Sequence, residues 1–308
     1  MDEVTLYGAP LSYYSGKARA YLRWKGITFR ELAPSPEVYK QVIIPAVGYP
    51  VIPVVVTASG AVIQDSSDII DYFEARATGP GLGPAVYPAT PRQRLAALLL
   101  ELYGDEWLLI PAMHYRWAYN RDWVLGEFGA LRAPDAPPGE RRALGEKLAA
   151  RFQAMTPALG ATPQTIPAIE ASYEALLGEL DAHFAHYPYL LGTRPSIGDY
   201  GLIGPLYAHL YRDPASGALM KRLAPHVADW VERVHNPPAP GAGDFWPMIV
   251  SLTACCRFCA ARCASRCRCW LTPRSGWPTG ASATPGKHRR ATSAGTTFRS
   301  MARKGNGW

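Results

Sequence analysis

The sequence predicts an α/β domain followed by an all-α helical bundle domain, and three patterns support this fold class. In residues 4–75, short apolar runs alternate with amphipathic stretches in the order βαβ and then ββα. Residues 78–91 are rich in Gly and Pro, as is typical of a linker. Apolar residues then recur at helical spacing as far as about residue 234. We therefore expect two domains in one chain.

In the α/β part, Gly26 marks the end of the first helix and Ala58-Ser59-Gly60 marks a hairpin turn. The expected elements are, in order, a strand at Val4–Tyr7, a helix from about Ser15, strands at Thr28–Leu32, Val51–Thr57 and Ala61–Ile63, and a helix from Ser66. Each strand is short and rich in β-branched or aromatic residues, as strands of a small sheet are.

In the second part, apolar residues every three or four positions predict long amphipathic helices. The predicted helices are Arg92–Asn120, Arg141–Met155, Ala168–His186, Ser196–Leu210 and Ala218–Val234. Together these boundaries divide the chain into a first domain at residues 1–78, a linker at 79–91, a helical domain at 92–236, and a Pro/Gly linker with a tail at 237–308.

The tail differs sharply in composition from the rest. Its last 54 residues, from Cys255, hold all six cysteines and 11 of the 32 basic residues, with no acidic residue. The preceding 254 residues carry 21 basic and 25 acidic residues, so the formal net charge of +7 comes from the tail. The body is mildly acidic and gives no reason to expect nucleic-acid binding. Without cysteine it has no disulfide framework, thiolate metal site or nucleophilic thiol.

Three interpretations of the tail were weighed. Cys256-x-x-Cys259 is compatible with a zinc module, but the spacing of the later cysteines fits no common finger. A basic arm for nucleic acid is the second. We favour the third, out-of-frame translation of a GC-rich gene or another sequence error, because the composition changes abruptly. Such a segment is expected to be disordered and not a native domain.

Two segments of the first domain have the chemistry of helix N-termini. Ser12-Tyr13-Tyr14-Ser15 lies just before the first helix, where a hydroxyl can either cap the helix or donate a hydrogen bond to a ligand. Asp65-Ser66 starts the later helix, whose free N–H groups suit a carboxylate, although plain capping explains this pair equally well. Between them, Pro53 follows Ile52 at the start of a strand, where a proline is tolerated at a bend or an edge.

Taken together, these segments resemble the glutathione S-transferase superfamily. The resemblance covers about Val4 to Trp230 and includes a Ser196-x-x-Asp199 capping box within Leu190–Tyr200. It implies a thioredoxin-like first domain that binds glutathione. Pro53 would be a cis-proline, and Ile52 would pair through its backbone with the cysteinyl part of glutathione. Ser66 would bind the γ-glutamyl carboxylate, and Asp65 its ammonium group.

The resemblance also assigns the catalytic step. The Ser12 hydroxyl would donate a hydrogen bond to the glutathione sulfur and raise its thiolate fraction, with Tyr13, Tyr14 and Ser15 as alternatives. Serine stands where redox members of the wider fold have thiols, so a mixed disulfide with the enzyme is not expected. A serine-type transferase that conjugates glutathione to a hydrophobic electrophile fits better.

The electrophile is expected in a cleft between the domains. Its candidate lining residues are Tyr13, Met113, His114 and Trp117. The alternative for each of them is a place in the core or at a dimer contact. His183-x-x-His186 is weak evidence for a metal, so no metal and no cofactor besides glutathione as co-substrate are expected.

The remaining expectations concern the whole protein. A homodimer and a role in detoxification follow from the resemblance. With neither a signal peptide nor a membrane span in the sequence, we expect a cytoplasmic protein. The rival to catalysis is a glutathione-binding or scaffold protein of the same fold without turnover.

Overall fold

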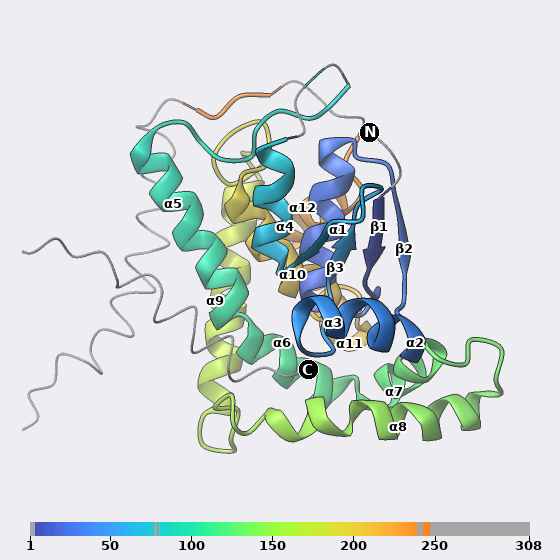
Figure 1. Cartoon of the computed structure of the whole chain (residues 1–308). Coiled ribbons are helices and arrows are strands. Elements are labelled where there is room, and N and C mark those ends of the chain that lie inside the picture. The colour runs from blue at the N-terminus through green and yellow to red at the C-terminus, as the bar shows by residue number, and fades with distance from the viewer. Residues whose placement is uncertain (1–3, 77–78, 80, 239–242, 247–308) are drawn as a thin grey trace, which may run out of the picture.

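The computed structural model describes residues 4–76, 79, 81–238 and 243–246. The interpretations of the cysteine- and arginine-rich tail fall outside these residues. Within them lies a small sheet with flanking helices, followed by a helical bundle (Figure 1). Both parts of the predicted fold class are thereby confirmed. No helix of this described portion is both long and apolar enough to cross a membrane.

The sheet has four strands in the order β2-β1-β3-β4. The strands are β1 (Val4–Tyr7), β2 (Phe29–Leu32), β3 (Val54–Val56) and β4 (Val62–Gln64). β1 runs parallel to β2 and antiparallel to β3, and β3 and β4 form an antiparallel hairpin. The parallel pair is joined by α1 (Tyr13–Lys25), and α4 (Ser66–Glu74) follows the hairpin. This is the predicted βαβ-ββα order.

Local signals account for these boundaries. α1 ends at Gly26, whose φ of 73° lies in the left-handed region that glycine adopts without a steric penalty. Between β2 and β3 the chain forms α2 (Pro36–Val38), a π-helical turn η1 (Tyr39–Ile43) and α3 (Ile44–Val47). The sequence pattern did not predict this segment, because three short turns carry no sustained helical period.

The helical part consists of α5 to α12 with one π-helical turn, η2. Their bounds are α5 (Pro91–Leu102), η2 (Tyr103–Trp107), α6 (Leu109–Tyr119), α7 (Arg121–Ala130), α8 (Pro138–Met155), α9 (Ile166–Phe184), α10 (Ile197–Ala208), α11 (Pro214–Leu223) and α12 (Pro225–His235). α7 was not predicted, and it packs against α8.

Two predicted helices are interrupted in the structure. The Arg92–Asn120 helix is divided by η2 into α5 and α6. The Ala218–Val234 helix begins earlier, at Pro214, and breaks before Pro225, because a proline disfavours the α conformation of the residue before it. Ala224 accordingly has a ψ of 67°, outside the helical region.

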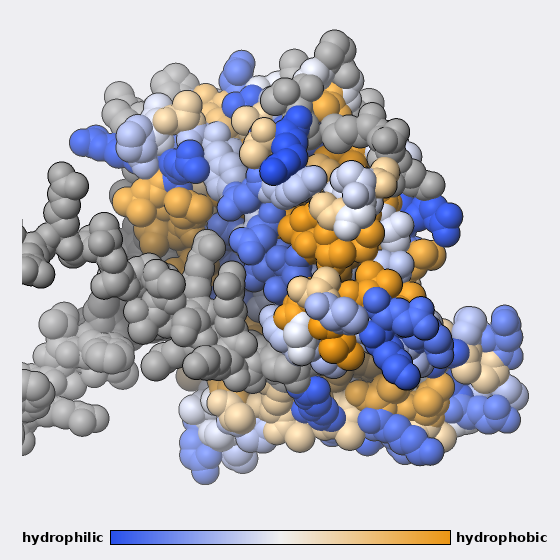
Figure 2. All heavy atoms as spheres, in the orientation of Figure 1, coloured by the Kyte–Doolittle hydropathy of each residue, from blue (hydrophilic) through white to orange (hydrophobic). Residues whose placement is uncertain are grey.

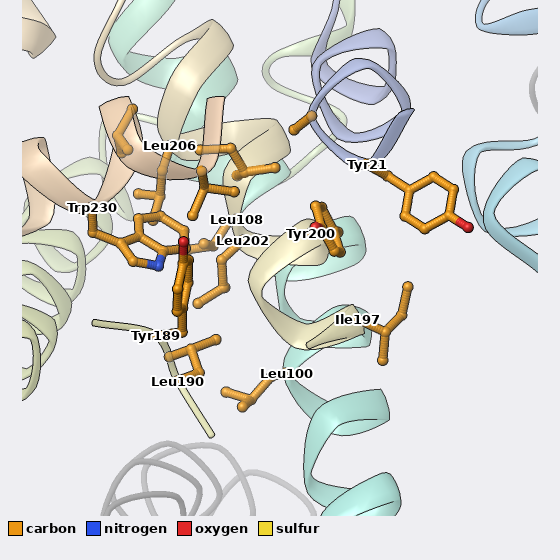
Figure 3. Close-up of a cluster of buried hydrophobic side chains, with 14 of the residues drawn as sticks. Tyr21, Leu100, Leu108, Tyr189, Leu190, Ile197, Tyr200, Leu202, Leu206 and Trp230 are labelled. Carbon is orange, nitrogen blue, oxygen red and sulfur yellow. The ribbon is translucent and has the colours of Figure 1, made fainter. Parts of the chain in front are cut away.

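A shared apolar core joins the sheet domain to the bundle, with α10 through its centre (Figure 3). Tyr21 of α1 meets Tyr200 of α10 edge-on, with ring centroids 5.6 Å apart. Close to these rings, Gly201 of α10 lies so near Glu101 of α5 that an added Cβ would fall 2.4 Å from the Glu101 Cα. The missing side chain lets α10 touch α5 closely, and α10 also packs against α1.

The Ser196–Asp199 capping box predicted from the sequence is present. Asp199 is fully buried, and its Oδ2 accepts hydrogen bonds from Ser196 N at 2.8 Å and Ser196 Oγ at 2.9 Å. Its Oδ1 accepts from Leu190 N and from Trp230 Nε1. The box therefore ties the start of α10 to the preceding loop and to α12.

Candidate functional site

Ser12 occupies the N-cap position of α1. Its Oγ accepts a hydrogen bond from Ser15 N at 3.4 Å and another from Ser15 Oγ at 2.9 Å. Among the described residues its own hydroxyl proton has no acceptor. Ser12 is half-buried. Ser15 is fully buried, and its hydroxyl proton is donated to Ser12 Oγ. Helix capping and an available O–H donor thus coexist at Ser12, and Ser15 is the weaker candidate.

The two tyrosines next to Ser12 have other partners. The Tyr13 hydroxyl donates to the carbonyl of Gly104, and the Tyr14 hydroxyl donates to the carbonyl of Asp105 at 2.9 Å. Burial, with the neighbouring acidic side chains, holds the pKa of both phenols well above the ordinary value. Both protons are therefore committed to η2 carbonyls, which disfavours either tyrosine as the donor to a thiol.

Ile52 and Pro53 lie directly before β3. The peptide bond between them is cis, as the resemblance implied. Pro53 is buried and Ile52 half-buried. Neither the backbone N–H nor the carbonyl of Ile52 has a hydrogen-bond partner among the described residues. These two groups are thus available to an added peptide strand.

Asp65 and Ser66 stand at the beginning of α4. Asp65 is its N-cap, and its Oδ1 accepts from Ser67 N at 2.9 Å. Its φ of 78° is the only positive φ of a non-glycine residue in the described ranges, and such a conformation costs about 1–3 kcal/mol. Ser66 is buried, yet no described residue pairs with its hydroxyl. Asp65 thus caps the helix, while the Ser66 hydroxyl stays available.

The N-termini of α1 and α4 are linked by a buried lysine that sequence reasoning missed. Lys17 of α1 is fully buried, and its Nζ donates to Ser67 Oγ at 2.9 Å. It also contacts Glu101 Oε1 at 2.7 Å and Asp105 Oδ2 at 2.6 Å. We call Lys17, Ser67, Glu101 and Asp105 the Lys17 cluster. A lysine at four-residue spacing from Tyr13 and Tyr21, on the buried face of α1, was the available signal.

The charges of the Lys17 cluster are unequal, because two carboxylates share one ammonium group. Burial raises the pKa of Asp105 to about 7, and Glu101 and Asp65 add to this rise while Lys17 opposes it. Burial lowers the pKa of Lys17, but Asp105 and Glu101 outweigh it and the net direction is upward. Asp105 Oδ1 is buried without a hydrogen-bond partner among the described residues. One proton near neutral pH can therefore change the charge balance beside Asp65 and Ser66.

The residues predicted to line the second-substrate cleft are buried. Met113, His114 and Trp117 of α6 are 6%, 3% and 7% exposed. Met113 and Trp117 pack in one apolar cluster with Leu11, which precedes Ser12. His114 Nε2 lies 2.7 Å from Glu170 Oε1 of α9. Tyr13, the fourth candidate, is in the shared core. These positions favour the packing role that was weighed as the alternative for each of them.

No cluster of three or more metal-binding side chains occurs within the described ranges. His183, one half of the His-x-x-His pair, has its Nε2 3.1 Å from the carbonyl of Tyr189. Burial lowers the pKa of His183. The His183 ring is therefore neutral, and it is hydrogen-bonded to a backbone carbonyl just after α9.

The chain matches two family models. The model of the glutathione S-transferase N-terminal domain matches residues 6–81, and that of the glutathione S-transferase C-terminal domain matches residues 163–233. A comparison with curated proteins found no match.

Solved structures with a similar fold include the beta-etherase LigF from Sphingobium sp. strain SYK-6. It is 17% identical, with a TM-score of 0.51 over 77% of this chain and 96% of that chain. A tau-class glutathione S-transferase from mango, Mangifera indica, is 17% identical, with a TM-score of 0.49 over 77% of this chain and 90% of that chain. The two matched domains, in this order on this fold, show that the chain belongs to the glutathione S-transferase superfamily.

Proposed function

We propose that the protein binds glutathione at the N-termini of α1 and α4 and activates its thiol for conjugation to a hydrophobic electrophile. The observation that carries the proposal is the Ser12 hydroxyl. Among the described residues it only accepts hydrogen bonds, as the cap of α1, so its proton is available to a ligand atom at a helix N-terminus. Membership of the family supports glutathione as that ligand.

The peptide part of glutathione would bind along the edge before β3 and at the start of α4. The backbone groups of Ile52, which pair with no described residue, support pairing with the cysteinyl unit next to Pro53. The available Ser66 hydroxyl, with the N-terminus of α4, supports binding of the γ-glutamyl carboxylate. The exposed carboxylate of Asp65 supports pairing with the ammonium group.

In the proposed reaction the glutathione thiol loses its proton to solvent, and the Ser12 O–H donates a hydrogen bond to the sulfur anion. This bond stabilises the thiolate and lowers the thiol pKa below its ordinary value of about 8.5. The thiolate then forms a carbon–sulfur bond with the electrophile, and the leaving group departs with its electron pair. No cofactor enters this scheme.

Binding is tested by calorimetric titration of the full chain with glutathione. Asp65→Asn keeps a side chain that tolerates a positive φ and can cap α4, but removes the charge. We expect it to weaken binding by about 1.5–3 kcal/mol, the range for a charge-assisted hydrogen bond. The matched control is Asp71→Asn. Asp71 is a carboxylate further along α4 that accepts a hydrogen bond from the Tyr87 hydroxyl, and its replacement should leave glutathione affinity unchanged. Wild-type affinity in the Asp65→Asn variant would reject the site.

Turnover separates the proposal from its rival, a non-catalytic glutathione-binding or scaffold protein. A conjugation assay with an aryl halide follows product formation, and the wild type should exceed the uncatalysed rate while Ser12→Ala should not. Glutathione binding without turnover for a panel of electrophiles would favour the rival. If Tyr14→Phe abolishes turnover and Ser12→Ala does not, the phenol is the catalytic group.

We also propose a homodimer. α5 carries an apolar stripe on its outer side, and Figure 2 shows an apolar patch over this helix. The stripe consists of Leu95, Leu98, Leu99 and Leu102, which are 59%, 38%, 45% and 48% exposed. Positions three and four apart share one helix face, and such an exposed face is typical of a protein–protein contact.

Light scattering tests the dimer. The wild type should have twice the mass of one chain at micromolar concentration, and Leu98→Glu with Leu102→Glu should give a monomer. Leu223→Glu, at an exposed leucine of α11, is the control and should stay dimeric. A monomeric wild type would reject this proposal without affecting the glutathione site.

A further inference from the structure

Arg116 of α6 is 2% exposed, and all five of its N–H groups donate hydrogen bonds. Nε donates to Asp213 Oδ2 at 2.6 Å, and Nη2 donates to Asp213 Oδ1 at 2.8 Å and to the Ala208 carbonyl at 2.6 Å. Nη1 donates to His209 Nε2 and to the Leu11 carbonyl, both at 2.9 Å. We call Arg116, Asp213, His209 and Leu11 the Arg116 cluster.

Four of these five bonds stay within the helical part, and one reaches the loop between β1 and α1. That bond, to the Leu11 carbonyl, joins residues 105 positions apart in the sequence. The Leu11 side chain is buried in an apolar cluster that includes Met113 and Trp117 of α6. The helical part therefore contacts Leu11 through both its side chain and its backbone carbonyl.

The Leu11 carbonyl belongs to the same planar peptide unit as the N and Cα atoms of Ser12, so fixing one end of the unit fixes the other. The opposite side of this unit is also held, because Ser12 N donates to the Ala9 carbonyl at 3.0 Å. Arg19 Nη2 in turn donates to the Ala9 carbonyl at 3.0 Å. Together with the φ of −84° that Ser12 has as the N-cap of α1, this plane sets the direction of the Cα–Cβ bond of Ser12.

The charges of Arg116 and His209 do not vary near neutral pH. A guanidinium keeps its proton in proteins. Burial, with Arg116 alongside, holds the pKa of His209 well below its ordinary value, so this ring is neutral. Since Arg116 donates to Nε2, the proton of His209 is on Nδ1. The arginine thus holds the loop with a constant charge and a fixed planar geometry.

We propose that Arg116 is a positioning residue for Ser12: it orients the Leu11–Ser12 peptide from the helical domain and thereby directs the Ser12 hydroxyl toward the glutathione sulfur. This inference rests on the proposed function, in which Ser12 is the hydrogen-bond donor. It adds that the donor of the first domain has its geometry set by the second domain.

The test compares Arg116→Lys with Asp213→Asn in the full chain. A lysine nitrogen is a single point and cannot reach Asp213 and the Leu11 carbonyl as the planar guanidinium does. Asp213→Asn weakens the same buried ion pair but leaves the Arg116–Leu11 bond in place. Both variants should lower the midpoint of urea unfolding, so stability does not distinguish them. The pKa of the thiol of bound glutathione, which reports on Ser12, does. This pKa is read from thiolate absorbance over a pH series, and glutathione affinity is measured by calorimetry.

In the wild type we expect the bound thiol to ionise at lower pH than free glutathione. Arg116→Lys should raise the pKa of that thiol by about one unit, a tenfold loss of thiolate, with affinity changed by less than about threefold. Asp213→Asn should leave the thiol pKa unchanged. In a Ser12→Ala background, Arg116→Lys should cause no further rise, because an effect transmitted through Ser12 vanishes with its hydroxyl.

A wild type that binds no glutathione, or binds it without lowering the thiol pKa, would reject the proposed function itself. A folded Arg116→Lys variant with the wild-type thiol pKa, or an equal rise in Asp213→Asn, would overturn only the role of Arg116. If Arg116→Lys does not fold, Arg116→Met combined with Asp213→Leu removes both buried charges and is read in the same way. Failure of this second variant to fold would assign Arg116 to stability alone.

Discussion

The Lys17 cluster and the Arg116 cluster both cross from the sheet domain to the helical bundle, but they differ in charge balance. Arg116 faces one carboxylate, and each of its donors has an acceptor. Lys17 faces two carboxylates, and Asp105 Oδ1 has no partner among the described residues. The Arg116 cluster adjoins Ser12, and the Lys17 cluster adjoins the start of α4.

This difference separates a cluster whose cation keeps its charge from one in which a carboxylate titrates near neutral pH. Burial raises the pKa of Asp213 above its ordinary value while the Arg116 ion pair opposes the rise, and the arginine itself does not titrate. In the Lys17 cluster the surplus carboxylate takes up a proton near pH 7. The loop of the proposed thiol donor is thus held by a cation that does not titrate, whereas the proposed carboxylate site has support that varies with pH.

The largest effect is expected from Arg116→Met. It leaves the fully buried Asp213 without its cation, which typically costs about 3–5 kcal/mol of unfolding free energy. Urea denaturation followed by circular dichroism measures the loss. Addition of Asp213→Leu should restore most of it, because no buried charge is then unpaired. A loss below 1 kcal/mol for Arg116→Met would contradict the assignment of this pair as a structural connection.

A smaller, pH-dependent loss is expected from Lys17→Met. Asp105 and Glu101 then lack their cation, but a proton can neutralise Asp105, so we expect about 1–3 kcal/mol at pH 8 and less at pH 5. The same denaturation of the variant and of the wild type at both pH values measures this change. A cost that is equal at pH 5 and pH 8 would contradict the uptake of a proton by Asp105.

Asp105→Asn isolates the titration. Folding raises the pKa of Asp105 to about 7 from its ordinary value of 3.8, so the native state binds more protons than the unfolded chain between these values. Its contribution to the unfolding free energy is therefore favourable at low pH and falls as pH rises from about 4 to about 7. Asp105→Asn should remove this part of the pH profile. An unchanged profile between wild type and variant would mean that Asp105 does not titrate in this range.

The smallest effect is expected from removing residues 255–308. The residues of both clusters and of the proposed glutathione site all precede position 214. The retained segment Asp244–Trp246 contacts the bundle, with Trp246 N donating to the Leu191 carbonyl at 3.1 Å. Glutathione affinity should be unchanged by calorimetry, and solubility should improve with the loss of six thiols. Loss of binding, or release of stoichiometric zinc from the full chain, would show that the tail is a functional module.

The sequence alone determined the features that depend on neighbouring residues. The helix start at Asp65-Ser66, the end of α1 at Gly26 and the Ser196–Asp199 capping box are local, because their partners lie within a few positions of each other. The alternation of strands and helices likewise follows from periods of two and 3.6 residues. These signals sufficed for the fold class, and the resemblance added the candidate residues of the proposed glutathione site.

Only the tertiary structure decided which polar residues meet across the two domains. Lys17 and Asp105 are 88 positions apart, and Arg116 and Leu11 are 105 apart, so no local pattern links them. In the structure the α5 face that carries Ala97 and Glu101 is buried, with Glu101 against Gly201 of α10, and the leucines of the apolar stripe on α5 are exposed. Periodicity shows that a helix has an apolar face, but packing against the rest of the chain decides which face is covered.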